Sequence, residues 1–332
     1  MLTILNDLHI GVLRSGGTTP ATAWNLRQQT LQATAQLLDE INTDLVINGD
    51  LFDSYACPHS DLLAAFEIFS QWLERGHKLW LVMGNHDLST DSTKLSAAEF
   101  FGKILESSYD TVKVLRGSGW INSETYAISH VSNQDLFDIE LSKVPDCRYL
   151  LLHCNYDNKF AAQSDNSLNL TEAAAKDLPV QTVVLGHEHQ RRVALDGKVQ
   201  IIGNQTPTSV ADCLGNKQKF YARLSPDLEL VTCWRSEGDF IELDWQELRE
   251  VPCRFVRITG EATAAQAPDV AKAISRYRSA SEALVVTNAV KIAQESGEGF
   301  AQDLETLQGF NVLDALLGFF TPEEAAVIKE NI

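Results

Sequence analysis

Positive charge is scarce in this chain. It has 27 Lys and Arg residues against 45 Asp and Glu residues, which gives a formal net charge of −18 at pH 7. A protein that holds nucleic acid through counterion release by basic residues alone is therefore excluded. Any chemistry on nucleic acid would need metal ions or a partner to offset the repulsion.

Paired cysteines and long apolar runs are also missing. No Cys-x-x-Cys pair occurs, which excludes a zinc ribbon or a dithiol redox motif and is typical of reduced thiols inside a cell. Asp7 and His9 interrupt the first apolar stretch, which is too short for a signal peptide or a membrane span. We therefore expect a soluble, cytoplasmic protein with no membrane contact.

The chain does contain enough apolar material for a core. Its 332 residues are 44% hydrophobic, which excludes disorder over the whole length and predicts one large and one small domain. Short runs rich in Val, Ile and Leu alternate with segments of helical period, which indicates a layered α/β core. The expected strands are 2–5, 45–47, 79–83, 149–152, 182–185 and 199–202, and the clearest helices are 23–41 and 61–75.

The pattern changes near residue 248, which ends the large domain, 1–248. Segment 249–295 predicts a small βαβ module with strands at 254–258 and 283–286 around a helix at 268–277. Segment 296–332 predicts two short helices, the second beginning at Thr321 with a capping box. The first has an apolar face that could pack on the chain's own module or on a partner, made of Leu313, Leu316, Leu317 and Phe320.

Metal-ligand residue types follow five of these strands, where each strand ends. In open α/β sheets the carboxyl ends of the strands lie along one edge, and the loops there converge on a ligand-binding crevice. A single Asp or His in a loop is more often just a hydrogen-bonding residue, but five such sets together favour a shared site. The sets are Asp7, His9 and Gly11; Gly49, Asp50 and Asp53; Gly84, Asn85, His86 and Asp87; His153; and Gly186, His187, Glu188 and His189.

These donors are a mixture of nitrogen and oxygen. Carboxylates, neutral imidazoles and an Asn carbonyl suit Mn, Fe or Zn rather than Ca, and the lack of thiolates argues against a structural zinc site. Asp7 and His9 are two residues apart, so on a strand they would point to the same side and reach one metal. The same spacing relates His187 and His189, although these two could serve different metals.

Two ions bridged by the carboxylate of Asp50, about 3.5–4 Å apart, would suit hydrolysis of a phosphate ester. They would acidify a bound water, orient it in line and neutralise charge on the phosphate oxygens. His86 is the candidate to protonate the leaving oxygen or stabilise the transition state, with Asp87 fixing the tautomer of its ring. Tight turns beside the ions are expected at Gly49, Gly84 and Gly186.

These blocks resemble the motifs of the calcineurin-like metallophosphoesterase superfamily, which are Asp-x-His, Gly-Asp, Gly-Asn-His-Asp or Glu, a lone His and Gly-His-x-His. All five occur in order between residues 7 and 189. The resemblance implies a four-layer αββα sandwich with a small C-terminal α/β cap and terminal helices. It also implies that His86 is a catalytic residue outside two metal sites, one made by Asp7, His9, Asp50 and His189, and the other by Asp50, Asn85, His153 and His187.

A narrower resemblance is to SbcD-type DNA double-strand-break repair nucleases, which work with an SbcC-type ATPase. It rests on Asp7-Leu-His-Ile-Gly11, on Gly49-Asp-Leu-Phe-Asp53 and on segment 201–209. Asn204 stands where these relatives usually carry Ser. Asp53 stands where eukaryotic and archaeal relatives carry His, so no second catalytic histidine is implied there.

This narrower resemblance implies a DNA exo- and endonuclease with two divalent ions, of which Mn is expected and Mg, Fe or Zn would also fit the ligands. It further implies that 249–295 contacts DNA, that 296–332 docks on the ATPase, and that the protein is a homodimer. Basic residues that could contact phosphate, or simply be solvated, are Arg14, Arg27, Arg191, Arg192, Arg254, Arg257, Arg276 and Arg278.

Two other functions stay open on the sequence. The same site would serve a small-molecule phosphoesterase that acts on cyclic nucleotides or phosphomonoesters, and the acidic composition fits that class better. The chain could instead be chiefly an interaction subunit, anchored by its C-terminal helices.

Overall fold

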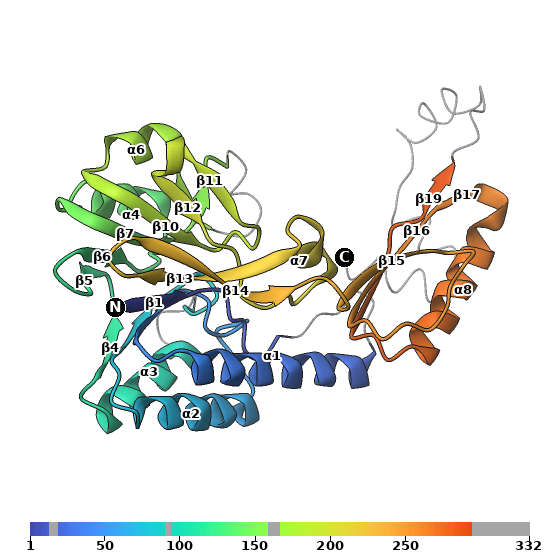
Figure 1. The fold of residues 1–332 in the computed structure, drawn as a ribbon, viewed down its shortest axis with the longest axis horizontal. Helices are drawn as coiled ribbons and strands as arrows, with labels where there is room; N and C mark the ends of the chain where they lie inside the picture. The colour runs from blue at the N-terminus through green and yellow to red at the C-terminus, as the bar shows by residue number, and fades with distance from the viewer. Residues whose placement is uncertain (13–18, 90–93, 159–166, 294–332) are drawn as a thin grey trace, which may run out of the picture.

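Two six-stranded sheets lie face to face in the main part of the protein, with helices on both outer sides (Figure 1). This arrangement comes from a computed structural model that describes residues 1–12, 19–89, 94–158 and 167–293. The six cysteines all fall in these ranges and form no disulfide. Among the described helices, none has both the length and the apolar character needed to cross a bilayer.

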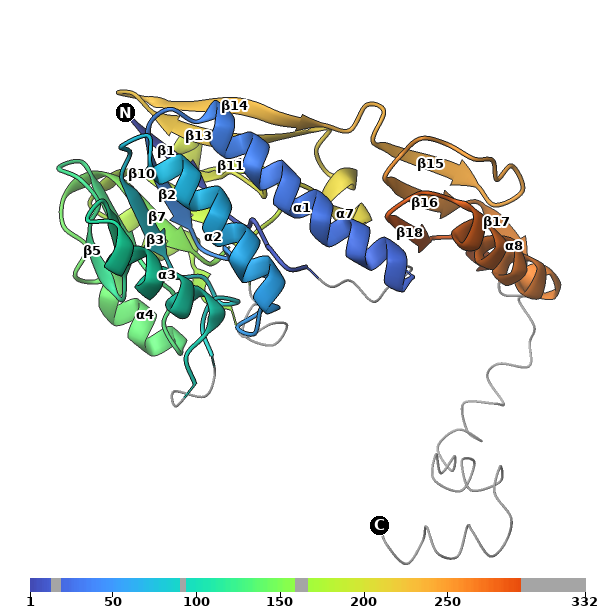
Figure 2. The ribbon, with the colours of Figure 1, turned by 90° about the horizontal axis from the view of Figure 1, so that it is seen from below.

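The first sheet has the strand order β14-β13-β1-β2-β3-β4. Its parallel part consists of β1 (Leu2–Leu5), β2 (Asp44–Asn48), β3 (Leu79–Val82) and β4 (Val112–Leu115). β13 (Gln218–Leu224) and β14 (Leu228–Arg235) complete it in antiparallel register. As Figure 2 shows, the outer face is covered by α1 (Pro20–Glu40), α2 (His59–Leu73) and α3 (Ala97–Ser108).

The second sheet has the order β11-β12-β10-β7-β6-β5. At its centre lie β7 (Cys147–His153) and β10 (Val180–Gly186), which are parallel. The flanking strands are β5 (Ser118–Trp120), β6 (Thr125–Ile128), β11 (Arg192–Ala194) and β12 (Val199–Ile201). The outer side carries α4 (Gln134–Leu141), α6 (Glu172–Asp177) and a two-stranded ribbon, β8 (Asn155–Tyr156) with β9 (Asn169–Leu170).

Apolar side chains fill all three interfaces between these layers. Ile4, Val46, Leu151 and Val184 are fully buried in the cluster between the two sheets, and separate clusters lie under the helices of each side. Because both faces of the central strands are covered, their sequences are continuous apolar runs and not alternating ones. The predicted four-layer αββα sandwich is confirmed, with all six predicted strands in place.

A small α/β module follows the sandwich. β15 (Phe240–Asp244), β16 (Phe255–Thr259) and β18 (Val285–Asn288) form a parallel sheet, with α8 (Ala267–Ala280) packed against it. β17 (Glu261–Thr263) and β19 (Lys291–Ala293) pair beside it. The sequence analysis did not predict β15, because its alternating and partly exposed Phe-Ile-Glu-Leu-Asp segment lacks a continuous apolar run. The division at residue 248 stays a prediction, and the helices expected in 296–332 lie outside the described residues.

The module is joined to the sandwich by an apolar cluster. Phe255 and Leu284 of the module lie in one buried cluster with Val12, which follows the first metal-ligand motif. The same cluster contains Val210 and Cys213 of α7 (Val210–Leu214). The module therefore rests on the loop after β1 and on α7, beside the end of the sandwich at which β1 stops (Figure 1).

Candidate metal centre

The seven expected metal ligands meet where the carboxyl ends of the two sheets come together. The first sheet contributes residues after β1, β2 and β3, and the second contributes residues at or after the ends of β7 and β10. In each of three groups, one donor atom per residue lies within 4.8 Å of the others. The groups are Asp7, His9 and His189; His9, Asp50 and His86; and Asp50, His153 and His187. Asn85 joins the third group through its Oδ1, 3.1 Å from His187 Nδ1.

The backbone brings these side chains together in a way that the sequence analysis did not predict. Asp7, His9, Asp50 and His187 all have positive φ, between 47° and 86°. Such conformations are uncommon for residues with a side chain and collect at functional sites. The expectation that Asp7 and His9 converge by strand alternation was wrong, because β1 ends at Leu5 and both residues lie in a left-handed turn.

Two glycines give the ligands the space they occupy. A Cβ on Gly84 would lie 2.1 Å from Asp50 Oδ1 and 2.5 Å from the Asp50 backbone nitrogen. A Cβ on Gly49 would lie 2.0 Å from His153 Nδ1. Neither neighbour can move away without leaving the cluster, so these glycines are needed for close packing around the ligands as well as for turns.

The hydrogen bonds of His153 show that its free nitrogen faces the centre as an acceptor. Its Nδ1 lies 2.9 Å from the backbone oxygen of Asn48, which can only accept, so Nδ1–H donates and Nε2 carries the lone pair. Nε2 is buried without a hydrogen-bond partner and lies 3.1 Å from Asp50 Oδ2. Two electron-rich atoms at this distance repel each other unless a cation or a proton lies with them.

The same arrangement occurs on the other side of the centre. His9 Nε2 and His189 Nε2 are 3.0 Å apart, while the Nδ1 atoms face the carboxylates of Asp53 at 3.2 Å and of Asp212 at 2.8 Å. His189 therefore donates its proton outward to Asp212 and turns a lone pair inward, whereas the contact of His9 with Asp53 is not a hydrogen bond and does not set the tautomer of His9. The donor set fits divalent cations. One group holds Asp7, His9 and His189, another holds Asp50, His153 and His187, and the third, His9, Asp50 and His86, shares a residue with each of them. The assignment of each residue to one of two ions stays a prediction.

Charge at the centre also favours a cation. Burial works against ionisation of Asp50, yet the nearby His153 and His9 hold the pKa of its carboxyl well below the usual range. Burial likewise lowers the pKa of His153, but the Asp50 carboxylate outweighs it and raises that pKa to about 10. In the absence of metal, a proton on His153 takes the place of a cation.

The His86 side chain faces the centre, whereas the Asp87 side chain is bonded to the backbone of the surrounding loops. His86 Nδ1 lies 2.6 Å from the Asp53 backbone oxygen, so Nδ1–H donates there and Nε2 faces the centre, 4.0 Å from Asp50 Oδ2. Asp87 is buried and accepts from the backbone N–H groups of Gly84, Phe52 and Leu51. The interpretation that Asp87 fixes the His86 tautomer was wrong, because the Asp53 carbonyl does so and Asp87 shapes the loops instead.

Several supporting residues were missed by the sequence analysis. Asn6 Nδ2 donates to the Asp7 carboxylate and to the Gly203 oxygen, and the Asn48 carbonyl orients His153. Asp212, in α7, orients His189. Ser209 and Asp212 form a capping box, a pattern that predicts the start of a helix but gives no sign of contact with a distant histidine.

The family model for calcineurin-like phosphoesterases matches residues 1–191, which is more than half of the chain and contains all seven expected ligands. The chain belongs to this family. It is therefore a metallophosphoesterase, a hydrolase family whose members bind two divalent metals. No curated protein matches the chain.

Solved structures that match this protein have little sequence identity to it. TT1561 of Thermus thermophilus is 12% identical, with 70% of this chain and 98% of that chain covered and a TM-score of 0.42. A dimetal phosphatase from Danio rerio is 12% identical over 70% and 96% of the two chains, with a TM-score of 0.38. A novel archaeal phosphodiesterase is 10% identical over 70% and 98%, with a TM-score of 0.32. Such distant likenesses give no information about the substrate.

Replacing Gly84 with Ala should remove metal from the centre. The added Cβ would displace the Asp50 carboxylate, which belongs to two of the three ligand groups. We expect the metal content, measured by inductively coupled plasma mass spectrometry, to fall by about tenfold or more. Gly119→Ala is the control, because its Cβ would meet only a Leu115 methyl carbon at 3.1 Å. Equal metal content in the two variants would contradict this account of Gly84.

The metal-free protein should lose stability as the pH rises from about 6.5 to about 10. The pKa of His153 is raised in the folded state, so its proton stabilises the fold fully below its unfolded value of 6.5 and no longer above about 10. Urea unfolding in EDTA across this range measures the effect. With saturating Zn²⁺ the slope should flatten, because the cation replaces the proton. A metal-free midpoint that does not change over this window would count against the assignment.

Proposed function

We propose that this phosphoesterase is a Mn-dependent DNA exo- and endonuclease, the nuclease subunit of an SbcCD-type complex. The observation that carries the proposal is the position of the small α/β module. It packs on Val12 and on α7, so it stands immediately beside the loops that hold His9 and His189. Because the module stands at the edge of the metal centre, an extended substrate such as DNA could contact the module and the centre at the same time.

The residues around the centre support cleavage of a phosphodiester. Two bound divalent ions would acidify the attacking water and neutralise charge on the phosphate. The His86 side chain is 39% exposed, and its Nδ1–H is committed to the Asp53 oxygen, so a proton for the leaving oxygen would come from Nε2 of the cationic ring, which then returns to the neutral Nδ1–H form. A half-exposed acid that faces solvent suits a leaving group that belongs to a long chain.

A small-molecule phosphoesterase is the second candidate, and the arginines favour it. Four of the basic residues expected near phosphate are already paired with carboxylates of the chain, which reduces the positive charge left for DNA. The pairs are Arg27 with Asp61, Arg192 with Glu188, Arg254 with Asp239, and Arg257 with Glu242. In a complex, the ATPase would have to provide most of the DNA affinity.

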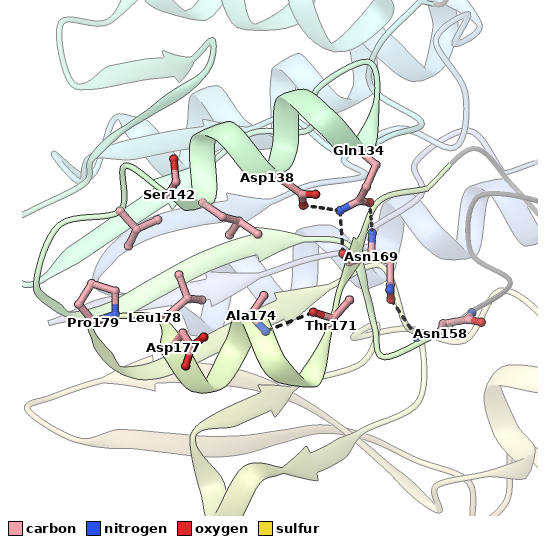
Figure 3. A pocket seen from close by; sticks show the side chains of 12 residues that line it. Gln134, Asp138, Ser142, Asn158, Asn169, Thr171, Ala174, Asp177, Leu178 and Pro179 are labelled. Atoms are coloured by element: carbon pink, nitrogen blue, oxygen red, sulfur yellow. Dashed lines mark hydrogen bonds between the residues drawn. The ribbon is translucent and has the colours of Figure 1, made fainter.

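Such a small substrate would have to bind at the metal centre. A pocket of about 590 Å³ lies apart from the centre, between α4 and α6 (Figure 3). Its polar groups are bonded to one another, since Gln134 Nε2 donates to Asp138 Oδ1 at 2.7 Å and to the Asn169 oxygen at 3.0 Å. None of its lining residues is an expected metal ligand.

The proposal includes two partners besides DNA, namely a second copy of the chain and an SbcC-type ATPase. An apolar groove of about 290 Å³ runs between α2 and α3, lined by Phe66 and Ile104 among others. Leu63 and Phe100, which also line it, are 60% and 45% exposed. Of the proposed contacts, we assign the homodimer to this groove, because Leu63 and Phe100 expose apolar surface there. The ATPase is assigned to segment 296–332.

Replacing His86 with Ala should separate catalysis from metal binding. With Mn²⁺ and linear duplex or single-stranded DNA, we expect kcat to fall by about 10²- to 10⁴-fold with unchanged metal content. His77→Ala is the control, because His77 packs on Trp72, away from the centre. Intact DNA with wild-type protein, together with turnover of bis(p-nitrophenyl) phosphate, would favour the small-molecule function. Equal rates for His86→Ala and wild type would reject the role of His86.

The two protein partners should respond to different changes. Leu63→Glu places a charge on the apolar groove and should convert a dimer into a monomer in light scattering, with nuclease activity on short DNA retained. Deletion of 300–332 should abolish ATPase binding and leave the dimer intact. Ile139→Glu, at a residue that is 49% exposed on α4, is the matched control for the groove. A wild-type monomer, or a dimer unaffected by Leu63→Glu, would contradict the assigned surface.

A further inference from the structure

His189 is the ligand most dependent on support from outside the cluster. It lies past the end of β10, in a loop, with its Nε2 3.0 Å from His9 Nε2. Two contacts fix it: Lys219 Nζ donates to its backbone oxygen at 2.7 Å, and its ring Nδ1 lies 2.8 Å from Asp212 Oδ1. Asp212 is in α7, outside the residues matched by the family model.

We propose that Asp212 is a positioning residue for one of the two metal ions. An ionised carboxylate can only accept, so His189 must hold its proton on Nδ1 and turn the Nε2 lone pair toward the ion. Asp212 therefore sets both the tautomer and the plane of the ring. The inference rests on the proposed two-metal centre and is independent of whether the substrate is DNA.

The carboxylate of Asp212 is itself tightly held. Its Oδ2 accepts from the backbone N–H of Thr208 at 2.8 Å, from the Thr208 hydroxyl at 3.1 Å and from the backbone N–H of Ser209 at 2.9 Å. The residue is 3% exposed. With three donors on one oxygen and His189 on the other, the side chain has a single arrangement that satisfies every partner.

The affinity for one ion should depend on Asp212 more than the affinity for the other. His189 belongs to the ligand group with Asp7 and His9. In the group of Asp50, His153 and His187, the ring of His153 is oriented by the Asn48 carbonyl, and the carboxylate of Asp212 is bonded instead to His189, Thr208 and Ser209. Loss of the Asp212 carboxylate should therefore lower the affinity for one ion and leave the affinity for the other unchanged.

Asp212→Asn tests this unequal dependence. The Asn oxygen can meet either the three donors or His189; facing the three donors, it turns its NH₂ toward His189 Nδ1, which favours the wrong tautomer. In Mn²⁺ titrations of the full chain by calorimetry, we expect one of two sites to weaken by about 10- to 100-fold and the other to stay unchanged. Ser209→Ala is the matched control, because it removes the cap of α7 and keeps the contact with His189.

Two results would overturn the proposal. One is equal behaviour of Asp212→Asn and Ser209→Ala, which would show that Asp212 only caps α7. The other is loss of both ions together in Asp212→Asn. A measurement on the wild type covers the case in which the variant does not fold. In the Zn²⁺-loaded protein, ¹⁵N chemical shifts of the His189 ring must report a proton on Nδ1, and a proton on Nε2 would reject the assignment.

Discussion

Repulsion between electron-rich atoms is the constraint on which the rest of this structure depends. Among the expected ligands, four imidazole rings and two carboxylates point toward one small region, and pairs such as His9 with His189 approach within 3.0 Å. A hydrogen bond relieves this repulsion only for a pair in which one of the two atoms carries a proton. Positive charge has to come from outside the polypeptide, which is why a chain with a net charge of −18 can still act on a phosphate ester.

The outward-facing atoms of the histidines matter as much as the inward-facing ones. Backbone oxygens hold the protons of His153 and His86, and the Asp212 carboxylate holds that of His189. In each ring, an acceptor on one side leaves the opposite nitrogen free for a metal or for a leaving group. Contacts made away from the reaction thus orient His153 and His189 as expected metal ligands and His86 as the expected proton donor.

Much of this fold could be predicted because buried strands and the motifs that follow them are encoded in short, continuous stretches of sequence. Apolar runs such as Leu79–Val82 mark buried strands, and the motifs after them belong to the ends of those strands. The convergence of Asp7 and His9 could not be derived correctly, because the enrichment of Asp and His in left-handed turns is too weak to mark a particular residue as having positive φ. Asp212 and the Asp53 carbonyl escaped notice for a related reason, since their contacts join distant segments or use backbone atoms that every residue has.

The strand order of the first sheet has a consequence for folding during translation. β1 leads directly into the first ligand motif, and its neighbour on one side is β13, whose residue Leu224 pairs with Leu2. During translation, that edge of β1 stays unpaired until β13 has left the ribosome, when more than two thirds of the chain has been synthesised. Pairing between strands so far apart in sequence is also slow. A nascent chain cut short before β13 would therefore expose an unpaired strand edge beside the first ligand motif, and such an edge favours aggregation.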